Sequence, residues 1–257
     1  MEKLYLKYLK ERRKNDSMER LNTGVKGLDE KMKGGFVEGS VNLITGKTGT
    51  GKTAFCISFL YTGAQKNEPG VFVTTEEPEE DVKADIKSMF GWDIEALEKK
   101  KLIKFVSLEP VVPISFEREE AMGKILKIYV YDLYSRIEDA VKKMKAKRLV
   151  IDSTTILEMF IKDDYLRRVA LMKFINDLKK LKITVIVTGT VPEGTDLLSV
   201  SGIIEFFVDS VTKLEFLPVA EEFKRTLTIR KMRRTDHSIY IHPFEITKDG
   251  LKILEIK

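Results

Sequence analysis

The chain has 257 residues, of which 43% are hydrophobic and 33% charged. A chain of this length buries roughly three-quarters of the surface that its unfolded form exposes, so this composition excludes an intrinsically disordered chain. Its apolar stretches fall far short of the roughly 18 residues that a membrane-spanning helix requires. The 45 Lys and Arg exceed the 40 Asp and Glu by five, an excess that is compatible with nucleic acid binding without requiring it.

Residues 1–17 form a charged N-terminal extension that contains Leu4, Leu6 and Leu9. A short helix or strand that docks elsewhere fits this pattern, and so does disorder. Charges such as Glu2 and Lys3 interrupt the apolar run that a secretory signal needs, so we expect a cytoplasmic protein without a membrane partner. We assign the remaining residues, 18–257, to one domain.

Strands and helices alternate through the first two-thirds of this domain. Short apolar runs rich in β-branched residues predict buried strands, and apolar positions spaced by three and four residues predict helices between them. Strands joined by helices pair in parallel through right-handed crossovers. The predicted strands are 41–45, 71–75, 103–108, 149–151 and 183–188, and the predicted helices are 54–61, 81–90, 132–147 and 165–181.

After about residue 205 the pattern changes to strands alone, at 206–216, 226–232, 238–246 and 251–256. Consecutive strands without helices indicate antiparallel hairpins, which we expect to extend one edge of the parallel sheet. The predicted fold class is therefore α/β, with a mostly parallel central sheet flanked by helices and completed by C-terminal antiparallel strands.

A glycine-rich segment between the first strand and the first helix fits the pattern G-x-x-x-x-G-K-[ST]. Its glycines let successive backbone N–H groups face one anion, and the helix that follows adds the positive end of its dipole. The lysine would reach the β- and γ-phosphates of ATP, and the last hydroxyl would bind Mg²⁺. The segment consists of Gly46, Lys47, Thr48, Gly49, Thr50, Gly51, Lys52 and Thr53.

Carboxylates at the ends of two other buried strands complete a hydrolytic set. Asp152 follows the apolar run 149–151 and is the candidate second ligand for Mg²⁺, beside Thr53. Glu76 and Glu77 follow the strand 71–75, so both should lie at the sheet edge where open α/β sheets bind ligands. Hydrolysis needs a base there to orient water beside the γ-phosphate, and an acidic helix start is the alternative explanation of this pair.

These segments, with several others, resemble the KaiC-like branch of the RecA-superfamily ATPases over nearly the whole chain. The resemblance rests on TG-x-x-GLD at 23–29, GG-x-x-x-GS at 34–40, the P-loop, the paired glutamates, Ile151-Asp152-Ser153, and a segment at 231–237 similar to K-x-R-G-T-x-H. It implies a homo-oligomer, often a hexameric ring, with ATP between subunits. It also implies that Lys231 and Arg233 reach a neighbour's γ-phosphate, and that Glu76 is the base with Glu77 in support.

Three positions depart from the family pattern. Arg234 replaces a usual glycine, so the backbone there is expected to differ. Thr188-Gly189-Thr190 stands where relatives commonly carry Thr-Thr-Glu, which weakens the expectation of γ-phosphate sensing. Glu205-Phe206 falls on the hydroxyl pair that the clock protein phosphorylates in its second domain, which excludes autophosphorylation at these two residues.

The leading functional hypothesis is an oligomeric, slowly turning Mg²⁺-ATPase whose nucleotide state switches its contacts with an unidentified protein partner. A DNA-dependent recombination-type motor is a second hypothesis, but residues 192–201, after the fifth strand, carry no Lys or Arg to line a DNA channel. A nucleotide-binding interaction module with little hydrolysis is a third, favoured by the missing Thr-Thr-Glu.

Overall fold

The computed structural model of the protein describes residues 18–108, 119–161, 163–195, 197–219 and 222–255. The predicted N-terminal extension, residues 1–17, lies outside them. In the described part of the chain, no helix has both the length and the apolar character that crossing a bilayer requires.

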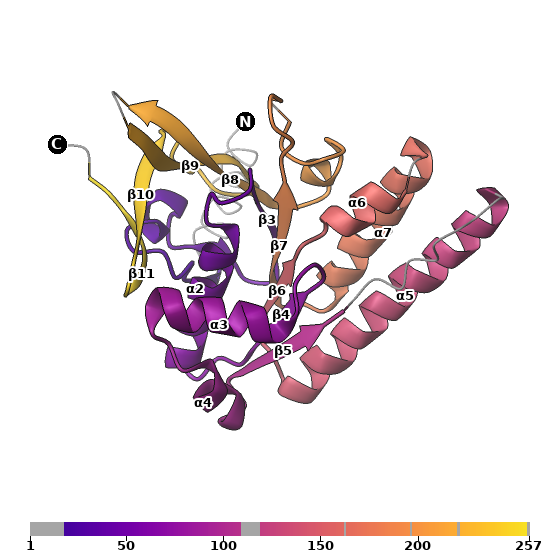
Figure 1. Ribbon diagram of the computed structural model, residues 1–257, viewed down its shortest axis with the longest axis horizontal. Helices are drawn as coiled ribbons and strands as arrows, with labels where there is room; N and C mark the ends of the chain where they lie inside the picture. Colours follow the sequence, from indigo (N-terminus) through magenta and orange to yellow (C-terminus); the bar gives the residue numbers. More distant parts are fainter. Residues whose placement is uncertain (1–17, 109–118, 162, 196, 220–221, 256–257) are drawn as a thin grey trace, which may run out of the picture.

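A nine-stranded sheet with the order β11-β10-β9-β8-β3-β7-β6-β4-β5 forms the centre of the molecule (Figure 1). The six neighbouring strands β8, β3, β7, β6, β4 and β5 run parallel. Strands β9, β10 and β11 add antiparallel pairs at the β8 edge. The strands are β3 (Val41–Gly46), β4 (Gly70–Thr74), β5 (Ile103–Ser107), β6 (Arg148–Asp152), β7 (Thr184–Thr190), β8 (Ser210–Val219), β9 (Glu222–Met232), β10 (His242–Thr247) and β11 (Gly250–Ile253).

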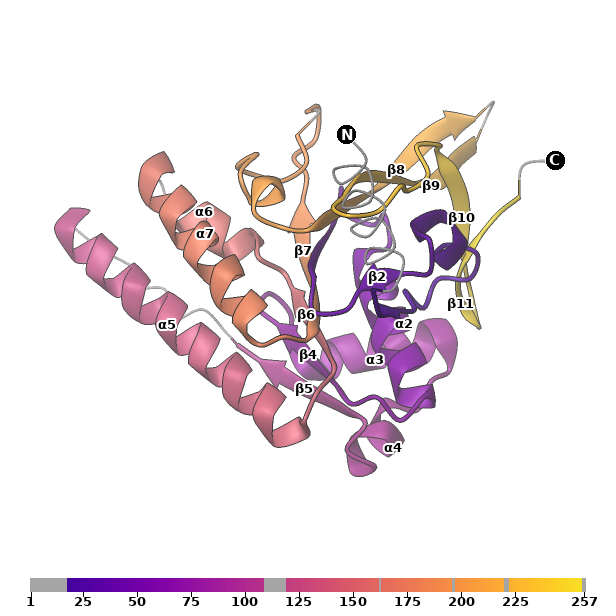
Figure 2. The same ribbon diagram turned by 180° about the vertical axis from the view of Figure 1, so that it is seen from behind.

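Helices cover both faces of the sheet, as Figures 1 and 2 show from opposite sides. One apolar core lies under α2 (Lys52–Gln65), α3 (Glu79–Phe90) and α4 (Ile94–Lys99). The other lies under α5 (Glu119–Met144), α6 (Thr155–Phe160) and α7 (Asp164–Lys180). A small hairpin of β1 (Arg20–Leu21) and β2 (Phe36–Val37), with the 3-10 turn η1 (Asp29–Met32), packs against the first core. The predicted α/β class, with parallel strands extended by hairpins, is confirmed.

Two expectations about the last third of the chain are wrong in detail. The strand predicted from residue 206 begins at Ser210, because Ile204–Phe206 forms the 3-10 turn η2. This strand, β8, pairs in parallel with β3, so the antiparallel part starts one strand later, at β9. The strand predicted from residue 238 begins at His242, since the preceding apolar residues Ile239 and Tyr240 are 80% and 72% exposed rather than paired.

A buried ion pair fixes the start of β6, the strand that carries Asp152. The Arg148 side chain is fully buried, and its Nη2 lies 2.6 Å from Oε2 of Glu68. Its Nη1 donates to the carbonyls of Asn22 and Phe59 at 2.8 and 3.0 Å. Burial lowers the pKa of Arg148, and the Glu68 carboxylate opposes that shift. The guanidinium therefore depends on Glu68 for its only ionic partner among the described residues.

Replacing Glu68 by alanine is expected to destabilise the fold by about 3 kcal/mol, because it leaves a buried charge without its counter-ion. Urea unfolding measures the change. Asp139→Ala, which removes an exposed pair with Lys143, is the control and should cost less than about 1 kcal/mol. Equal effects of the two substitutions would contradict the assigned role of Glu68.

Candidate nucleotide site

The glycine-rich loop connects β3 to α2 at the carboxyl end of β3, and it needs its glycines for two different reasons. A Cβ on Gly46 would lie 2.3 Å from the carbonyl oxygen of Leu214, so the loop could not leave β3 beside β8. Gly51 has φ of 106°, a left-handed conformation that L side chains rarely adopt, and it forms the N-cap of α2. The first turn of α2 therefore opens toward the cleft beside the loop.

Lys52 lies at the floor of the loop. Its Nζ donates to the carbonyls of Gly46 and Lys47 at 2.9 and 3.0 Å. Burial lowers the pKa of Lys52, and the negative charges of Asp152 and Glu76 oppose that shift. A partly buried cation that is held by two neutral carbonyls is suited to exchange them for phosphate oxygens, because hydrogen bonds between charged groups are stronger.

Not every residue of the loop faces the cleft. Thr48, Gly49, Gly51, Lys52 and Thr53 line it, whereas Gly46, Lys47 and Thr50 do not. Lys47 forms an ion pair with Glu193 at 2.6 Å. The buried Thr50 hydroxyl donates to the Lys47 carbonyl at 2.8 Å, which closes the loop on itself.

Three strands and a helix converge on Asp152 at the end of β6. Oδ2 of Asp152 accepts a hydrogen bond of 2.7 Å from the Thr53 hydroxyl, and Oδ1 accepts one of 2.5 Å from the Thr188 hydroxyl. The contact between Thr188 and Asp152 joins the segment that replaces Thr-Thr-Glu to the acidic centre. The carboxylate of Asp152 and the hydroxyl of Thr53 are oxygen ligands of the type that Mg²⁺ prefers.

The residues present fit a magnesium ion that is shared with a nucleotide. Within the described ranges, no group of three or more His, Cys, Asp and Glu side chains could hold a metal by itself. Mg²⁺ usually takes one or two protein ligands and completes its shell with water and substrate phosphates. Thr53 and Asp152 supply that number of ligands, and a bound Mg²⁺ would offset the negative charge of the phosphates.

Glu76 and Glu77 lie where β4 ends, at the mouth of the same cleft. Oε1 of Glu76 accepts a hydrogen bond from the Ser153 hydroxyl, which follows Asp152. Burial and repulsion by Asp152 raise the pKa of Glu77. The Thr74 hydroxyl donates to the Glu77 carbonyl at 2.6 Å and so turns the chain, and Pro78 is the N-cap of α3. Both glutamates thus stay outside the helix, exposed toward the cleft.

The cleft has a volume of about 340 Å³, within the range of small-molecule sites. Its wall also holds Thr190, which belongs to the segment in the place of Thr-Thr-Glu, and four residues that no sequence motif marks: Val82, Met89, Arg225 and Ile246. The guanidinium of Arg225 lies 5.1 Å from the Phe216 ring, and its buried Nε has no partner among the described residues. No motif marks Arg225; the antiparallel register of β8 and β9, which pairs it with Phe216, brings it to the cleft.

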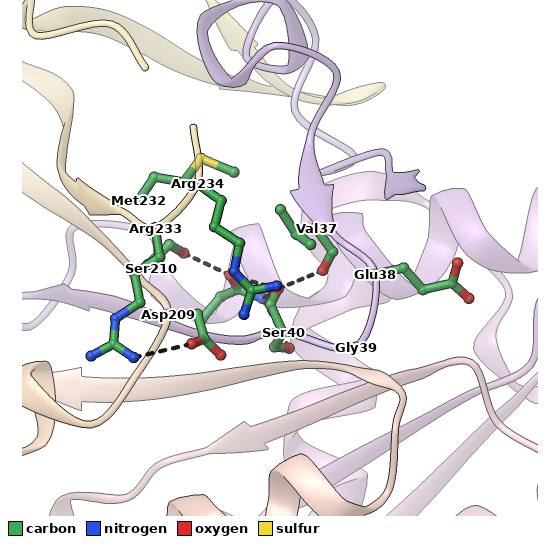
Figure 3. A pocket seen from close by; sticks show the side chains of 10 residues that line it. Val37, Glu38, Gly39, Ser40, Asp209, Ser210, Met232, Arg233 and Arg234 are labelled. Atoms are coloured by element: carbon green, nitrogen blue, oxygen red, sulfur yellow. Dashed lines mark hydrogen bonds and ion pairs between the residues drawn. The ribbon is translucent and has the colours of Figure 1, made fainter. Parts of the chain in front are cut away.

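Lys231 and Arg233 lie at the opposite end of the sheet from this cleft. Lys231 Nζ donates to the carbonyls of Glu205 and Val208, each at 2.8 Å. Arg233 lies 3.7 Å from the Asp209 carboxylate, and its Nη2 donates to the Phe206 carbonyl at 3.4 Å. Figure 3 shows the Arg233 guanidinium turned toward Asp209 in a pocket at the amino ends of β3 and β8.

Arg234 keeps a backbone conformation that glycine favours. Its φ is 57°, in the left-handed region, at a cost of roughly 1–2 kcal/mol for a residue with a side chain. Arg234 thus adopts, with a side chain, a backbone conformation that glycine adopts without this cost. The arginine side chain extends into the pocket that Arg233 and Asp209 line (Figure 3).

A P-loop at the end of a parallel strand and an aspartate at the end of a nearby strand, in this mostly parallel sheet, define a P-loop ATPase domain with the RecA-like fold. The family model for the KaiC ATPase matches residues 21–257. The chain belongs to the KaiC ATPase family.

Relatives of two lengths are similar to the chain. Circadian clock protein KaiC3 of Synechocystis is 35% identical over 245 residues, which are 94% of this chain and 46% of that protein. A UPF0273 protein of Thermotoga maritima is 34% identical over 238 residues, which are 92% of this chain and 96% of that protein. The crystal structure of the KaiC-like protein PH0186 from Pyrococcus horikoshii OT3 has a TM-score of 0.78 and 37% identity, and covers 93% of this chain and 100% of that one. The chain thus spans less than half the length of the KaiC clock proteins and nearly all of the single-domain relatives.

Proposed function

We propose that the protein is a Mg²⁺-dependent ATPase that binds ATP in the cleft and works as a homo-oligomer, with each site completed by a neighbouring copy. In this proposal the amides of the loop residues that line the cleft, together with the Lys52 ammonium, hold the phosphates, and Thr53 and Asp152 hold Mg²⁺. Glu76 acts as the base that orients the attacking water, with Glu77 in support. Arg225, which is aimed into the same cleft, adds positive charge beside the nucleotide.

The position of Lys231 and Arg233 carries the proposal. Ser210 pairs with both Asn42 and Met232, whereas the P-loop begins at Gly46, four residues further along β3. At about 3.3 Å per residue, the four residues from Asn42 to Gly46 span about 13 Å. The side chains of Lys231 and Arg233 extend away from the P-loop, toward carbonyls of residues 205–208, which precede β8. The pair therefore lies too far away to act on its own chain's nucleotide.

A neighbouring copy placed head to tail would bring this basic pair against the cleft of the first chain. Such heterologous contacts close into a ring when the rotation between copies permits it, and the family resemblance implies six copies. Positive groups supplied in trans stabilise the charge that develops during phosphoryl transfer. Hydrolysis would then depend on assembly.

We extend the proposal to a slow regulatory switch in the cytoplasm, in which the nucleotide state changes the contacts with a protein partner. Exposed apolar side chains on α7, including Tyr165 at 73% exposure, offer a surface for protein contact. The absence of Lys and Arg from residues 192–201 disfavours a nucleic acid channel.

Replacing both Glu76 and Glu77 by glutamine tests the hydrolytic part of this proposal. We expect ATP binding to be retained and turnover to fall by about 10² or more, because general base catalysis is removed while the P-loop is unchanged. A phosphate-release assay and a binding titration measure the two quantities. Glu80→Gln, an exposed acidic residue in the first turn of α3, is the matched control. Unchanged turnover in the double variant would move the base elsewhere, and ATP that survives intact for hours on the wild-type protein would favour the binding module.

A further inference from the structure

A buried carboxylate outside the cleft forms its hydrogen bonds with a single loop. Glu158 of α6 is 1% exposed, and its Oε2 accepts hydrogen bonds from the backbone N–H of Ser201, at 2.9 Å, and from the Ser201 hydroxyl. Its Oε1 has no partner among the described residues. Burial raises the pKa of Glu158, opposed by the hydrogen bonds from Ser201. A carboxylate buried at such a cost joins α6 firmly to residue 201.

On one side, Glu158 is connected to the candidate ATP cleft. Helix α6 begins three residues after Asp152, and Ser153 between them donates to Glu76. The Thr155 hydroxyl in the first turn of α6 accepts a hydrogen bond of 3.2 Å from the N–H of Thr190, which lines the cleft. Glu158 lies one turn further along this short helix. Hydrogen bonds therefore connect the cleft wall to α6, the helix that carries Glu158.

On the other side, the same loop holds the basic pair. The Ser199 hydroxyl accepts a hydrogen bond from the Gly202 N–H at 3.0 Å and donates to Oε2 of Glu205 at 2.9 Å. The carbonyl of Glu205 is one of the two that hold Lys231 Nζ at 2.8 Å. The loop also touches the strand that enters the P-loop, because the Thr45 hydroxyl donates to the Leu198 carbonyl.

We propose that Glu158 is a positioning residue that couples the nucleotide state of a chain's own cleft to the placement of the Lys231–Arg233 pair that the chain presents to its neighbour. The effect of this coupling on hydrolysis at the neighbouring site rests on the proposed function. ATP bound in a chain's own cleft would change the position of the basic pair that this chain presents to the next cleft. Each occupied cleft would therefore affect hydrolysis at the next cleft around the ring, always in the same direction. The coupling itself lies within one chain, and it can be measured whether or not the chains assemble.

The reactivity of Lys231 toward an amine-acylating reagent measures its placement. Burial and the nearby charge of Arg233 lower the pKa of Lys231, which favours the reactive neutral amine. Isotope-labelled wild-type chains are mixed with a large excess of unlabelled Lys52→Ala chains, so that nucleotide occupies the labelled chain's own cleft while the neighbouring cleft stays empty. Mass spectrometry then reads the acylation of Lys231 on the labelled chain, with and without a non-hydrolysable ATP analogue and Mg²⁺.

We expect the analogue to change the acylation rate of wild-type Lys231 about fivefold, at the lower end of typical couplings between sites. Glu158→Leu should abolish this response while nucleotide affinity stays within about twofold, because the acceptor of both Ser201 hydrogen bonds is lost. Glu158→Gln keeps one acceptor, Ser201→Ala keeps the backbone donor, and both should respond partially. Thr195→Ala is the control and should respond as the wild type does, because it removes a hydroxyl of the same loop whose hydrogen bond, among the described residues, goes to the Pro192 carbonyl.

The outcomes separate the two proposals. Wild-type chains that bind the analogue without any change at Lys231 would overturn the coupling and leave the ATPase proposal intact. Wild-type chains that bind no nucleotide would overturn both. If Glu158→Leu does not fold, the other two variants decide, since a full wild-type response in both of them also overturns the role of Glu158.

Discussion

Lys52→Ala is expected to weaken ATP binding by at least about a hundredfold, which corresponds to roughly 3 kcal/mol. The lysine is the only cation that lines the loop side of the cleft in the described part of the chain, and its Nζ already lies between the carbonyls of Gly46 and Lys47. Charge-assisted hydrogen bonds to phosphate are worth about 1.5–3 kcal/mol each, and the P-loop amides alone cannot replace the lost charge.

A second lysine of the same loop provides the control for this prediction. Lys47 does not line the cleft. Its side chain forms an ion pair with Glu193 at 2.6 Å, and both side chains are substantially exposed. Surface pairs contribute about 0–1 kcal/mol, so Lys47→Ala should change the affinity by less than about fivefold. Equilibrium titration with a fluorescent ATP analogue in Mg²⁺ measures both variants. Affinity in Lys52→Ala equal to that of the wild type would remove the phosphate-binding assignment of the loop.

Mixing two inactive variants is expected to restore ATPase activity. Chains with Lys52→Ala keep the basic pair but lose their own site, and chains with both Lys231→Ala and Arg233→Ala keep the site but lose the pair. If the pair acts in trans, a site is active when an intact P-loop faces an intact basic pair on the next copy. Random assembly from equal amounts produces this arrangement at about one interface in four, so we expect activity of up to about a quarter of the wild-type rate.

The location of the basic pair makes this outcome specific to a head-to-tail assembly. Within one chain, Lys231 and Arg233 are bonded to the turn 204–209, far from the P-loop of the same chain. Arg230→Ala serves as the control, because Arg230 is an exposed basic residue next to Lys231 on β9. Chains with this substitution keep both the P-loop and the basic pair, so they should keep wild-type activity. Sizing in ATP and Mg²⁺ would detect whether the two inactive variants co-assemble. A mixture that co-assembles but remains inactive would contradict a role in trans.

The order of strands and helices could be predicted because each element depends on its own residues. Runs rich in apolar and β-branched residues, such as 41–45 and 183–188, match β3 and β7 closely, since a strand buried on both faces needs such a sequence. Predictions failed where a contact between residues far apart in the sequence overrode the local pattern. Phe206 is aromatic and is followed by the apolar residues Phe207 and Val208, yet it lies in a turn, because the carbonyls of this turn hold Lys231 from β9.

The sequence by itself determined the phosphate-binding loop, because contiguous glycines and the helix that follows fix a local backbone that binds anions. Strand order decided everything that depends on distant segments. Asp152 and Thr53 are 99 residues apart, and the sheet brings them to 2.7 Å. Arg225 reached the cleft, and Glu158 reached Ser201, through packing that leaves no mark on the local sequence pattern. The parallel pairing of β3 and β8 likewise placed the basic pair at the end of the sheet opposite the P-loop. The chemistry of a side chain depends on its residue type alone, whereas the position of that side chain depends on the whole fold.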